Sequence, residues 1–71
     1  MIIKTTKEKL LANEWETDNG WDYKKETNTR ACMELDQMPS ILGEYRLYFW
    51  DADYPDDLIA IGEELKKLEV K

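Results

Sequence analysis

The chain is short, rich in aromatic side chains and strongly acidic. It has 71 residues, of which 42% are apolar and 11% aromatic, and its formal net charge is −6. This composition predicts one folded domain, near the lower size limit for a single hydrophobic core. No apolar run approaches the roughly 18 residues of a membrane span or the roughly 7–15 of a signal peptide. A single cysteine excludes an internal disulfide, so we expect a cytoplasmic protein.

The charge is unevenly distributed along the chain. Residues 1–30 carry six acids and six bases, whereas residues 31–65 carry nine acids against Arg46 alone. Nucleic acids and anionic membranes repel such a chain, so we expect neither direct nucleic-acid binding nor membrane binding. The expected charged partners are basic proteins or cations.

A short helix is predicted for residues 5–15. Thr5 and Glu8 have the spacing of a capping box, in which side chains satisfy the free backbone N–H groups at a helix start. Asn19 and Gly20 then indicate a hairpin turn, because both residues tolerate the positive φ of a type I′ turn. A longer helix that ends with Gly20 as its C-cap is the competing interpretation.

Three strands are predicted in the middle of the chain. Residues 20–26 place Trp21 and Tyr23 on one face, and residues 30–36 alternate apolar and polar side chains, so these two segments are expected to form a hairpin. Residues 44–51 alternate large side chains on both faces and have the clearest strand pattern. This strand is expected either to be central or to pack on one face and remain aromatic-rich on the other.

The C-terminal segment, residues 54–70, has the strongest helical pattern. One stripe of apolar residues recurs at spacings of three and four: Leu58, Ile61, Leu65 and Leu68. Gly62 lies inside this helix at a cost of about 1 kcal/mol relative to alanine. We interpret the glycine as a place where the helix closely approaches the sheet.

The predicted architecture is therefore a single α+β domain over residues 1–71. Its elements follow the order α-β-β-β-α, with a three-stranded antiparallel meander packed against helices on one face. The alternative is an additional strand at residues 1–5 or at residues 13–17.

The chain lacks the residues of most catalytic and metal sites. Without histidine there is no imidazole base and no His-containing zinc site, and one cysteine cannot build a metal cage. Its three glycines are isolated, so no phosphate-binding loop is present. Pairs of carboxylates could act as acid and base, but a core of this size leaves little volume for a substrate cleft. We therefore expect no enzyme activity, no cofactor and no metal site.

The acidic segment at residues 49–58 resembles a calcium loop only superficially. Counted from Asp51, an EF-hand requires glycine at its sixth position and a bidentate glutamate at its twelfth, where this chain has Asp56 and Gly62. The EF-hand interpretation therefore fails. A looser divalent-cation site formed by Asp51, Asp53 and Asp57 is retained as an alternative.

The start of a helix explains most of this acidic segment. Pro55 suits the first helical turn, Asp53 is placed to cap it, and the helix dipole favours Asp56 and Asp57 by roughly 0.3–1 kcal/mol each. Asp51 is left without an explanation.

The central strand cannot bury both of its faces against helices that lie on one side of the sheet. Either the odd-numbered or the even-numbered side chains stay exposed, unless the N-terminal helix covers the second face. Exposed tyrosine and tryptophan beside charged groups are typical of protein interfaces. The even-numbered face carries Tyr48 and Trp50, next to Asp51 and Asp53.

These features predict a domain that functions by protein–protein binding. The most concrete hypothesis is a small acidic inhibitor or adaptor against a basic partner, such as a nuclease, a restriction enzyme or a CRISPR effector, by analogy in size and charge with phage-type antagonists. Its predicted partner-binding residues are Tyr48, Trp50, Asp51, Asp53, Asp56 and Asp57. The alternative is an assembly subunit that forms a homodimer through an exposed sheet face.

Overall fold

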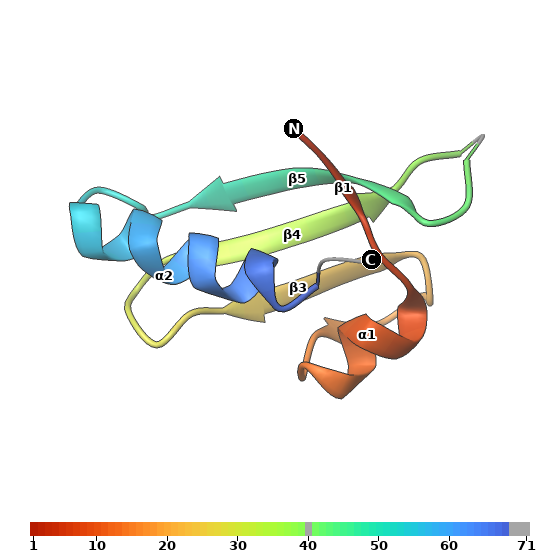
Figure 1. The fold of residues 1–71 in the computed structure, drawn as a ribbon, viewed down its shortest axis with the longest axis horizontal. Coiled ribbons are helices and arrows are strands. Elements are labelled where there is room, and N and C mark those ends of the chain that lie inside the picture. Colours follow the sequence, from red (N-terminus) through yellow and green to blue (C-terminus); the bar gives the residue numbers. More distant parts are fainter. Residues whose placement is uncertain (40, 69–71) are drawn as a thin grey trace.

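The computed structural model describes residues 1–39 and 41–68, which form one five-stranded antiparallel sheet and two helices (Figure 1). The elements in chain order are β1 (Ile2–Lys4), α1 (Lys7–Ala12), β2 (Glu16–Thr17), β3 (Asp22–Glu26), β4 (Cys32–Gln37), β5 (Glu44–Trp50) and α2 (Pro55–Lys66). The α+β class is confirmed, and the three predicted strands form the antiparallel meander β3-β4-β5 within a larger sheet. The sheet has five strands and not three, so the α-β-β-β-α order is wrong. Short strands form at both places that had been considered as alternatives, and they add the two sheet edges.

The register of the sheet separates its residues by number. The strand order is β1-β5-β4-β3-β2, so β4 is central and the two shortest strands are at the edges. Every register pairs residues of equal parity, as in Ile2 with Arg46, Glu34 with Tyr48 and Lys24 with Glu34. Directly paired residues share a face. All even-numbered strand residues therefore lie on one face and all odd-numbered ones on the other.

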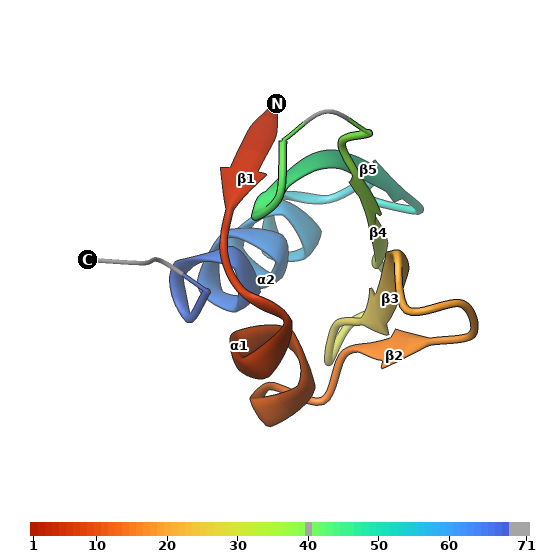
Figure 2. The ribbon, with the colours of Figure 1, turned by 90° about the vertical axis from the view of Figure 1, so that its right-hand side faces the viewer.

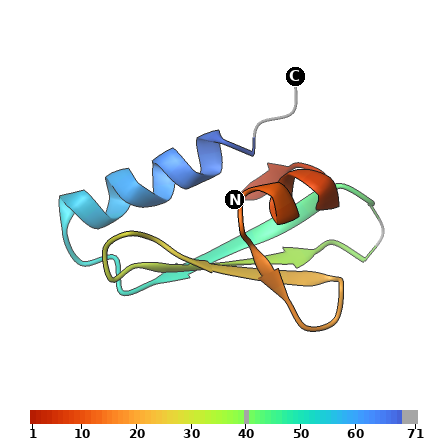
Figure 3. The same cartoon turned by 90° about the horizontal axis from the view of Figure 1, so that it is seen from below.

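Both helices cover the odd-numbered face. Figure 3 shows α1 and α2 on the same side of the strands, and Figure 2 shows the sheet curving around them. The core lies between these layers, where Tyr23 and Tyr45 meet edge to face with ring centroids 6.1 Å apart. The buried cluster comprises Leu10, Trp15, Tyr23, Ala31, Met33, Leu35, Tyr45, Leu47, Ile61 and Leu68. Neither helix in the described residues is long and apolar enough to span a membrane.

The first helix begins one residue later than the capping-box spacing predicts. Thr6 is the N-cap, and its hydroxyl accepts a hydrogen bond from the Lys9 N–H at 3.2 Å. Thr5 is instead buried, and its N–H donates to the Gly43 carbonyl at 3.0 Å. A Cβ at Gly43, which has φ +85°, would lie 3.3 Å from the Thr5 carbonyl oxygen, so this position requires glycine.

A hairpin forms around Asn19 and Gly20, but not through a type I′ turn. Gly20 has a positive φ of 78°, whereas Asn19 does not. The Asn19 side-chain oxygen accepts from the N–H groups of Trp21 (2.8 Å) and Asp22 (2.9 Å). Trp21 therefore belongs to the turn and is half exposed, while Tyr23 enters the core.

The second helix is rotated relative to its predicted apolar stripe. Ile61 and Leu68 pack into the core with Leu65 partly buried, but Leu58 is 53% exposed. Asp57 and Ala60 face inward in its place. Gly62 is exposed with open space around its Cβ position, so the predicted close approach to the sheet is wrong.

Candidate functional site

The helices leave the even-numbered face of the sheet uncovered (Figure 2 and Figure 3); we call it the open face. None of its strand residues is buried. Tyr48 and Trp50 lie there with 44% and 45% of their surface exposed. These two aromatic side chains project from β5 on the side opposite to the helices.

The open face is acidic. It carries six carboxylates and three basic groups among its strand residues. The carboxylates are Glu16, Asp22, Glu26, Glu34, Asp36 and Glu44, and the bases are Lys4, Lys24 and Arg46. Three of the carboxylates come from the first 30 residues, whose charges cancel along the sequence. Lys4 and Lys24 come from the same 30 residues, and with six carboxylates against three bases the strand residues of the open face carry an excess of three negative charges.

Three of these carboxylates repel one another. Asp22 lies directly opposite Asp36 on the neighbouring strand, and Glu34 lies two residues before Asp36 on the same face. Partial burial, followed by a shared hydrogen bond with Glu34 and the charges of Glu34 and Asp22, raises the pKa of Asp36 to about 6. Directly opposed like charges destabilise a sheet. Lys24 pairs with Glu34, and Arg46 lies opposite Asp36 on β5, but these two bases do not cancel the repulsion, because the pKa of Asp36 stays raised.

A shallow hollow of about 480 Å³ lies beside Trp50; we call it the Trp50 hollow. Its lining consists of Glu14, Glu16, Lys24, Lys25, Glu26, Cys32, Met33 and Trp50. Both lysines are already paired, Lys24 with Glu34 at 3.6 Å and Lys25 with Glu64 at 2.7 Å. Within the described residues, no ion pair involves the three glutamates of the hollow. The hollow thus combines an aromatic wall with uncompensated carboxylates.

The exposed aromatic rings differ in what covers them. Lys7 lies over the ring of Trp21 at 5.1 Å, and Arg30 lies over the ring of Tyr54 at 5.0 Å. In the part of the chain that the structure describes, no such cation covers Trp50. A cation from another molecule could therefore occupy the face of this ring.

The structure does not bring the six predicted binding residues together on one surface. Tyr48 and Trp50 belong to the open face, whereas Asp56 lies in the first turn of α2 beside Tyr54 and Arg30. Asp53 is exposed in the connection between β5 and α2. The predicted patch is thus divided between the sheet and the helix start.

Asp51 has a structural explanation that the sequence did not provide. It is exposed and adopts φ +59°, in the left-handed region, directly after the last residue of β5. Aspartate is one of the few residues besides glycine that tolerate this conformation. Asp51 therefore turns the chain out of the strand and toward α2.

Asp57 is a buried capping residue and not a surface acid. Only 3% of it is exposed, and its carboxylate accepts from the Tyr54 N–H at 3.1 Å. A hydrogen bond from the Thr29 side chain, helped by backbone N–H groups and Arg30, lowers the pKa of Asp57 although burial opposes the shift. Asp53 was predicted to cap this helix, but Tyr54 is the N-cap residue. Asp57 completes the capping box by accepting the Tyr54 N–H.

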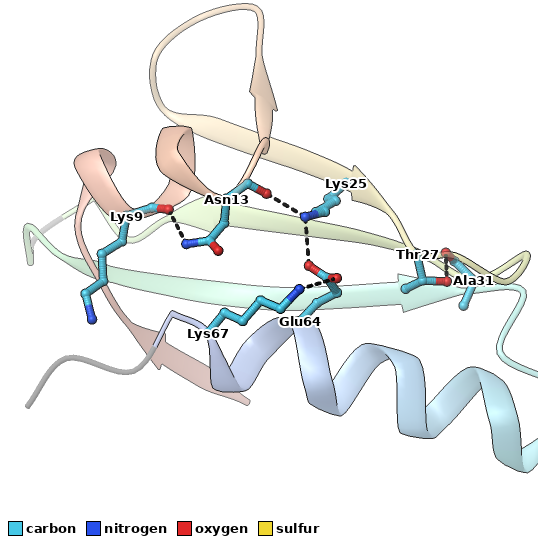
Figure 4. Close-up of polar contacts among 7 residues, drawn as sticks. All are labelled: Lys9, Asn13, Lys25, Thr27, Ala31, Glu64 and Lys67. Atoms are coloured by element: carbon cyan, nitrogen blue, oxygen red, sulfur yellow. Dashed lines mark hydrogen bonds and ion pairs between the residues drawn. The ribbon is translucent and has the colours of Figure 1, made fainter.

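The helix-covered face contains a polar cluster that sequence analysis did not find. Lys25, at an odd position of β3, donates to the Asn13 carbonyl at the end of α1 and pairs with Glu64 of α2 (Figure 4). Glu64 also pairs with Lys67 at 3.2 Å. Burial alone would raise the pKa of Glu64, but the two lysines hold it below its usual range. Lys25 thus joins both helices to the sheet.

Neither a metal site nor a reactive thiol is indicated in the described residues. No group of three metal-ligating side chains could hold an ion in the described part of the chain. Cys32 is half-buried on the open face, where desolvation and the charges of Glu26 and Asp51 raise the pKa of its thiol. A raised pKa keeps this thiol protonated and poorly nucleophilic at neutral pH.

The glutamates of the Trp50 hollow were also missed from the sequence. Glu14 and Glu16 lie at or beside an edge strand of two residues, and Glu26 lies 24 residues before Trp50. The alternation of charged residues at Asp22, Lys24 and Glu26 was the available signal. It becomes informative only when the register places Glu26 opposite Cys32, and Cys32 opposite Trp50.

Comparison with known protein families, curated proteins and solved structures finds no match to this chain.

Proposed function

We propose that this chain is a non-enzymatic binding domain whose open face binds a basic protein, so that the chain acts as an inhibitor or adaptor of that partner. The observation that carries the proposal is the Trp50 hollow, where an uncovered indole ring lies beside Glu14, Glu16 and Glu26. A lysine or arginine side chain satisfies both features, because its charge pairs with the carboxylates and its cation packs on the ring.

The carboxylates around Asp36 support the same partner. Repulsion among Asp22, Glu34 and Asp36 is a cost to the isolated fold, and a basic surface would relieve it. Binding should then release protons near pH 6 and strengthen as Asp36 ionises. Self-association is the weaker candidate, because two copies, each with a net charge of −6, would bring like charges together.

The test is capture of partners by the chain carrying a C-terminal tag, at about 0.05 M and about 0.5 M salt. We expect basic proteins to be captured at low salt and lost at high salt. Trp50→Ala should abolish capture. Tyr54→Ala should not, because Tyr54 lies outside the open face, although its ring is at least as exposed (56% against 45%).

A second pair of variants separates the position of the charge from its amount. Glu16→Gln with Glu26→Gln should weaken capture, and Glu8→Gln with Glu63→Gln should leave it unchanged, although both pairs remove two negative charges from exposed positions. Equal effects of the two pairs, or capture that survives high salt, would contradict the proposal. Sedimentation of the free chain would reveal a dimer if self-association were the function.

A further inference from the structure

The strand β5 has a free edge over its last residues. β1 pairs with Glu44, Tyr45 and Arg46, and the Leu47 N–H donates to the Met1 carbonyl at 3.0 Å. β4 continues to pair with β5 as far as Trp50. In the described part of the chain, no strand lies beside residues 48–50 on the side of β1, and Figure 1 shows β1 reaching only the first part of β5.

The backbone groups of Phe49 point toward this free edge. In β5 the even-numbered residues exchange hydrogen bonds with β4, as shown by the Met38 N–H donating to the Glu44 carbonyl at 2.9 Å. Odd-numbered residues point to the other side, as Leu47 does toward Met1. Because these directions alternate along a strand, the N–H and C=O of Phe49 face the position where a further strand would lie.

Apart from its short length, the edge lacks the features that usually protect a strand from pairing. Natural edges carry lysine, proline or inward-pointing charges. Residues 48–50 are all large aromatics, and each is between 44% and 49% exposed. Even the Phe49 side chain, on the helix-covered face, remains half exposed.

The charges near the edge select its occupant. Asp51 and Asp53 are exposed where β5 ends. On the open face, β5 itself carries Glu44 and Arg46, and the excess of carboxylates lies on the neighbouring strands β2 to β4. A second copy of the chain would oppose these acids with its own, whereas a basic segment would complement them.

We propose that an extended, basic segment of the partner adds a strand along residues 48–50 of β5, in line with β1. Its backbone pairs with Phe49, an apolar side chain packs beside the Phe49 ring, and the neighbouring basic side chains reach Tyr48, Trp50 and Asp51. This inference rests on the proposed function, and it identifies the part of the basic partner that binds as an extended strand. Such strand addition derives affinity from main-chain hydrogen bonds and specificity from alternate side chains.

The test uses a short synthetic peptide in which arginine alternates with valine, and the same peptide N-methylated at alternate amides. We expect the first peptide to bind and to slow hydrogen exchange of the Phe49 amide, and the second to bind at least about tenfold more weakly. Binding that is insensitive to N-methylation, or that leaves the Phe49 amide unprotected, would overturn the inference.

Two variants at Phe49 provide the matched comparison. Phe49→Pro removes the N–H that points to the free edge without removing a hydrogen bond to β4, whereas Phe49→Val keeps it. The proline variant should bind the peptide at least about tenfold more weakly than the valine variant. Comparable affinities would overturn the inference, and if the proline variant does not fold, exchange of the wild-type Phe49 amide decides.

Failure of this inference is distinguishable from failure of the proposed function. If basic proteins are captured through Trp50 but the Phe49 amide is unaffected by them, the partner uses the open face without adding a strand. If Trp50→Ala leaves capture unchanged, the proposed function itself fails. An N-terminal tag must be avoided in both experiments, because Met1 lies beside the same edge.

Discussion

Charged side chains on the two faces of the sheet have opposite surroundings. On the helix-covered face, Lys25 pairs with Glu64 and with the end of α1, and the pKa of Glu64 is lowered. On the open face, Asp36 lies beside two other carboxylates, and its pKa is raised to about 6. The Lys25–Glu64 pair therefore stabilises the fold, whereas the ionised carboxylate of Asp36 destabilises it. This difference indicates that the fold does not need the acidic character of the open face.

Lys24 and Lys25, which lie on opposite faces of β3, provide the test with the largest expected change in stability. Lys25→Met should lower the free energy of unfolding by about 2 kcal/mol, because Glu64 and the Asn13 carbonyl each lose a half-buried partner. Lys24→Met should change it by at most about 0.5 kcal/mol, because Lys24 is 64% exposed in its side chain and pairs at 3.6 Å. Urea denaturation of both variants measures the difference. Equal losses would show that the two faces do not differ.

Removing one carboxylate charge from the open face should raise the free energy of unfolding and not lower it. Asp36→Asn should raise the free energy of unfolding by about 1 kcal/mol at pH 7.5, because it relieves repulsion with Asp22 and Glu34. The folded-state pKa of Asp36 lies above its ordinary value of 3.8, so its stabilising contribution is complete below about pH 4. That contribution is lost as the pH rises through 6.

Thermal unfolding between pH 4 and pH 7.5 checks this dependence. In the wild type, the free energy of unfolding should decrease between pH 4 and pH 6 because Asp36 ionises. Asp36→Asn should lack this decrease. Glu63→Gln, on the exposed side of α2, should keep the decrease. Glu64 acts in the other direction, because a lowered pKa gives stability that is lost only as the pH falls below about 4.5.

A substitution on the exposed side of α2 should give a smaller gain in stability. Gly62→Ala should raise the free energy of unfolding by about 0.5–1 kcal/mol, because the added methyl group meets open space and glycine disfavours helices. Gly43→Ala should lower it, since that backbone has φ +85° and contacts Thr5. The melting temperatures of the two variants should move in opposite directions.

The junction at Asp51 should give the smallest change in stability. Asp51→Asn should alter the free energy of unfolding by less than about 0.3 kcal/mol, because asparagine also tolerates the left-handed backbone. Asp51→Val should lower the free energy of unfolding by about 1 kcal/mol, because a β-branched residue does not tolerate this backbone conformation. Any loss of basic-peptide binding by the asparagine variant then reports the charge and not the fold. Calorimetry measures stability and affinity on the same samples.

Strong periodicity explains which elements were predictable. The hairpin of β3 and β4, the strand β5 and the helix α2 all have clear alternation or helical spacing, and all were found. β1 and β2 contain only three and two residues. Strands this short are specified by pairing with β5 and β3, so only the possibility of extra strands could be raised from the sequence.

The candidate site was only partly predictable because its residues meet through the register. Tyr48 and Trp50 follow from the alternation of one strand, but Glu14, Glu16 and Glu26 join them through three other pairings. The buried position of Asp57 could not be predicted, because the apolar stripe of α2 placed Leu58 inward instead. The capping bond of Asp57 and its contact with Thr29 accompany the rotation that exposes Leu58.

The even-odd register has a practical consequence for engineering. Because one parity of residue number identifies the solvent side of every strand, the open face can be randomised without altering a core position. A library at positions 16, 24, 34 and 48 would vary a continuous row of side chains that crosses four strands. The odd-numbered residues and both helices would stay constant, and the domain would serve as a compact scaffold for new binding specificities.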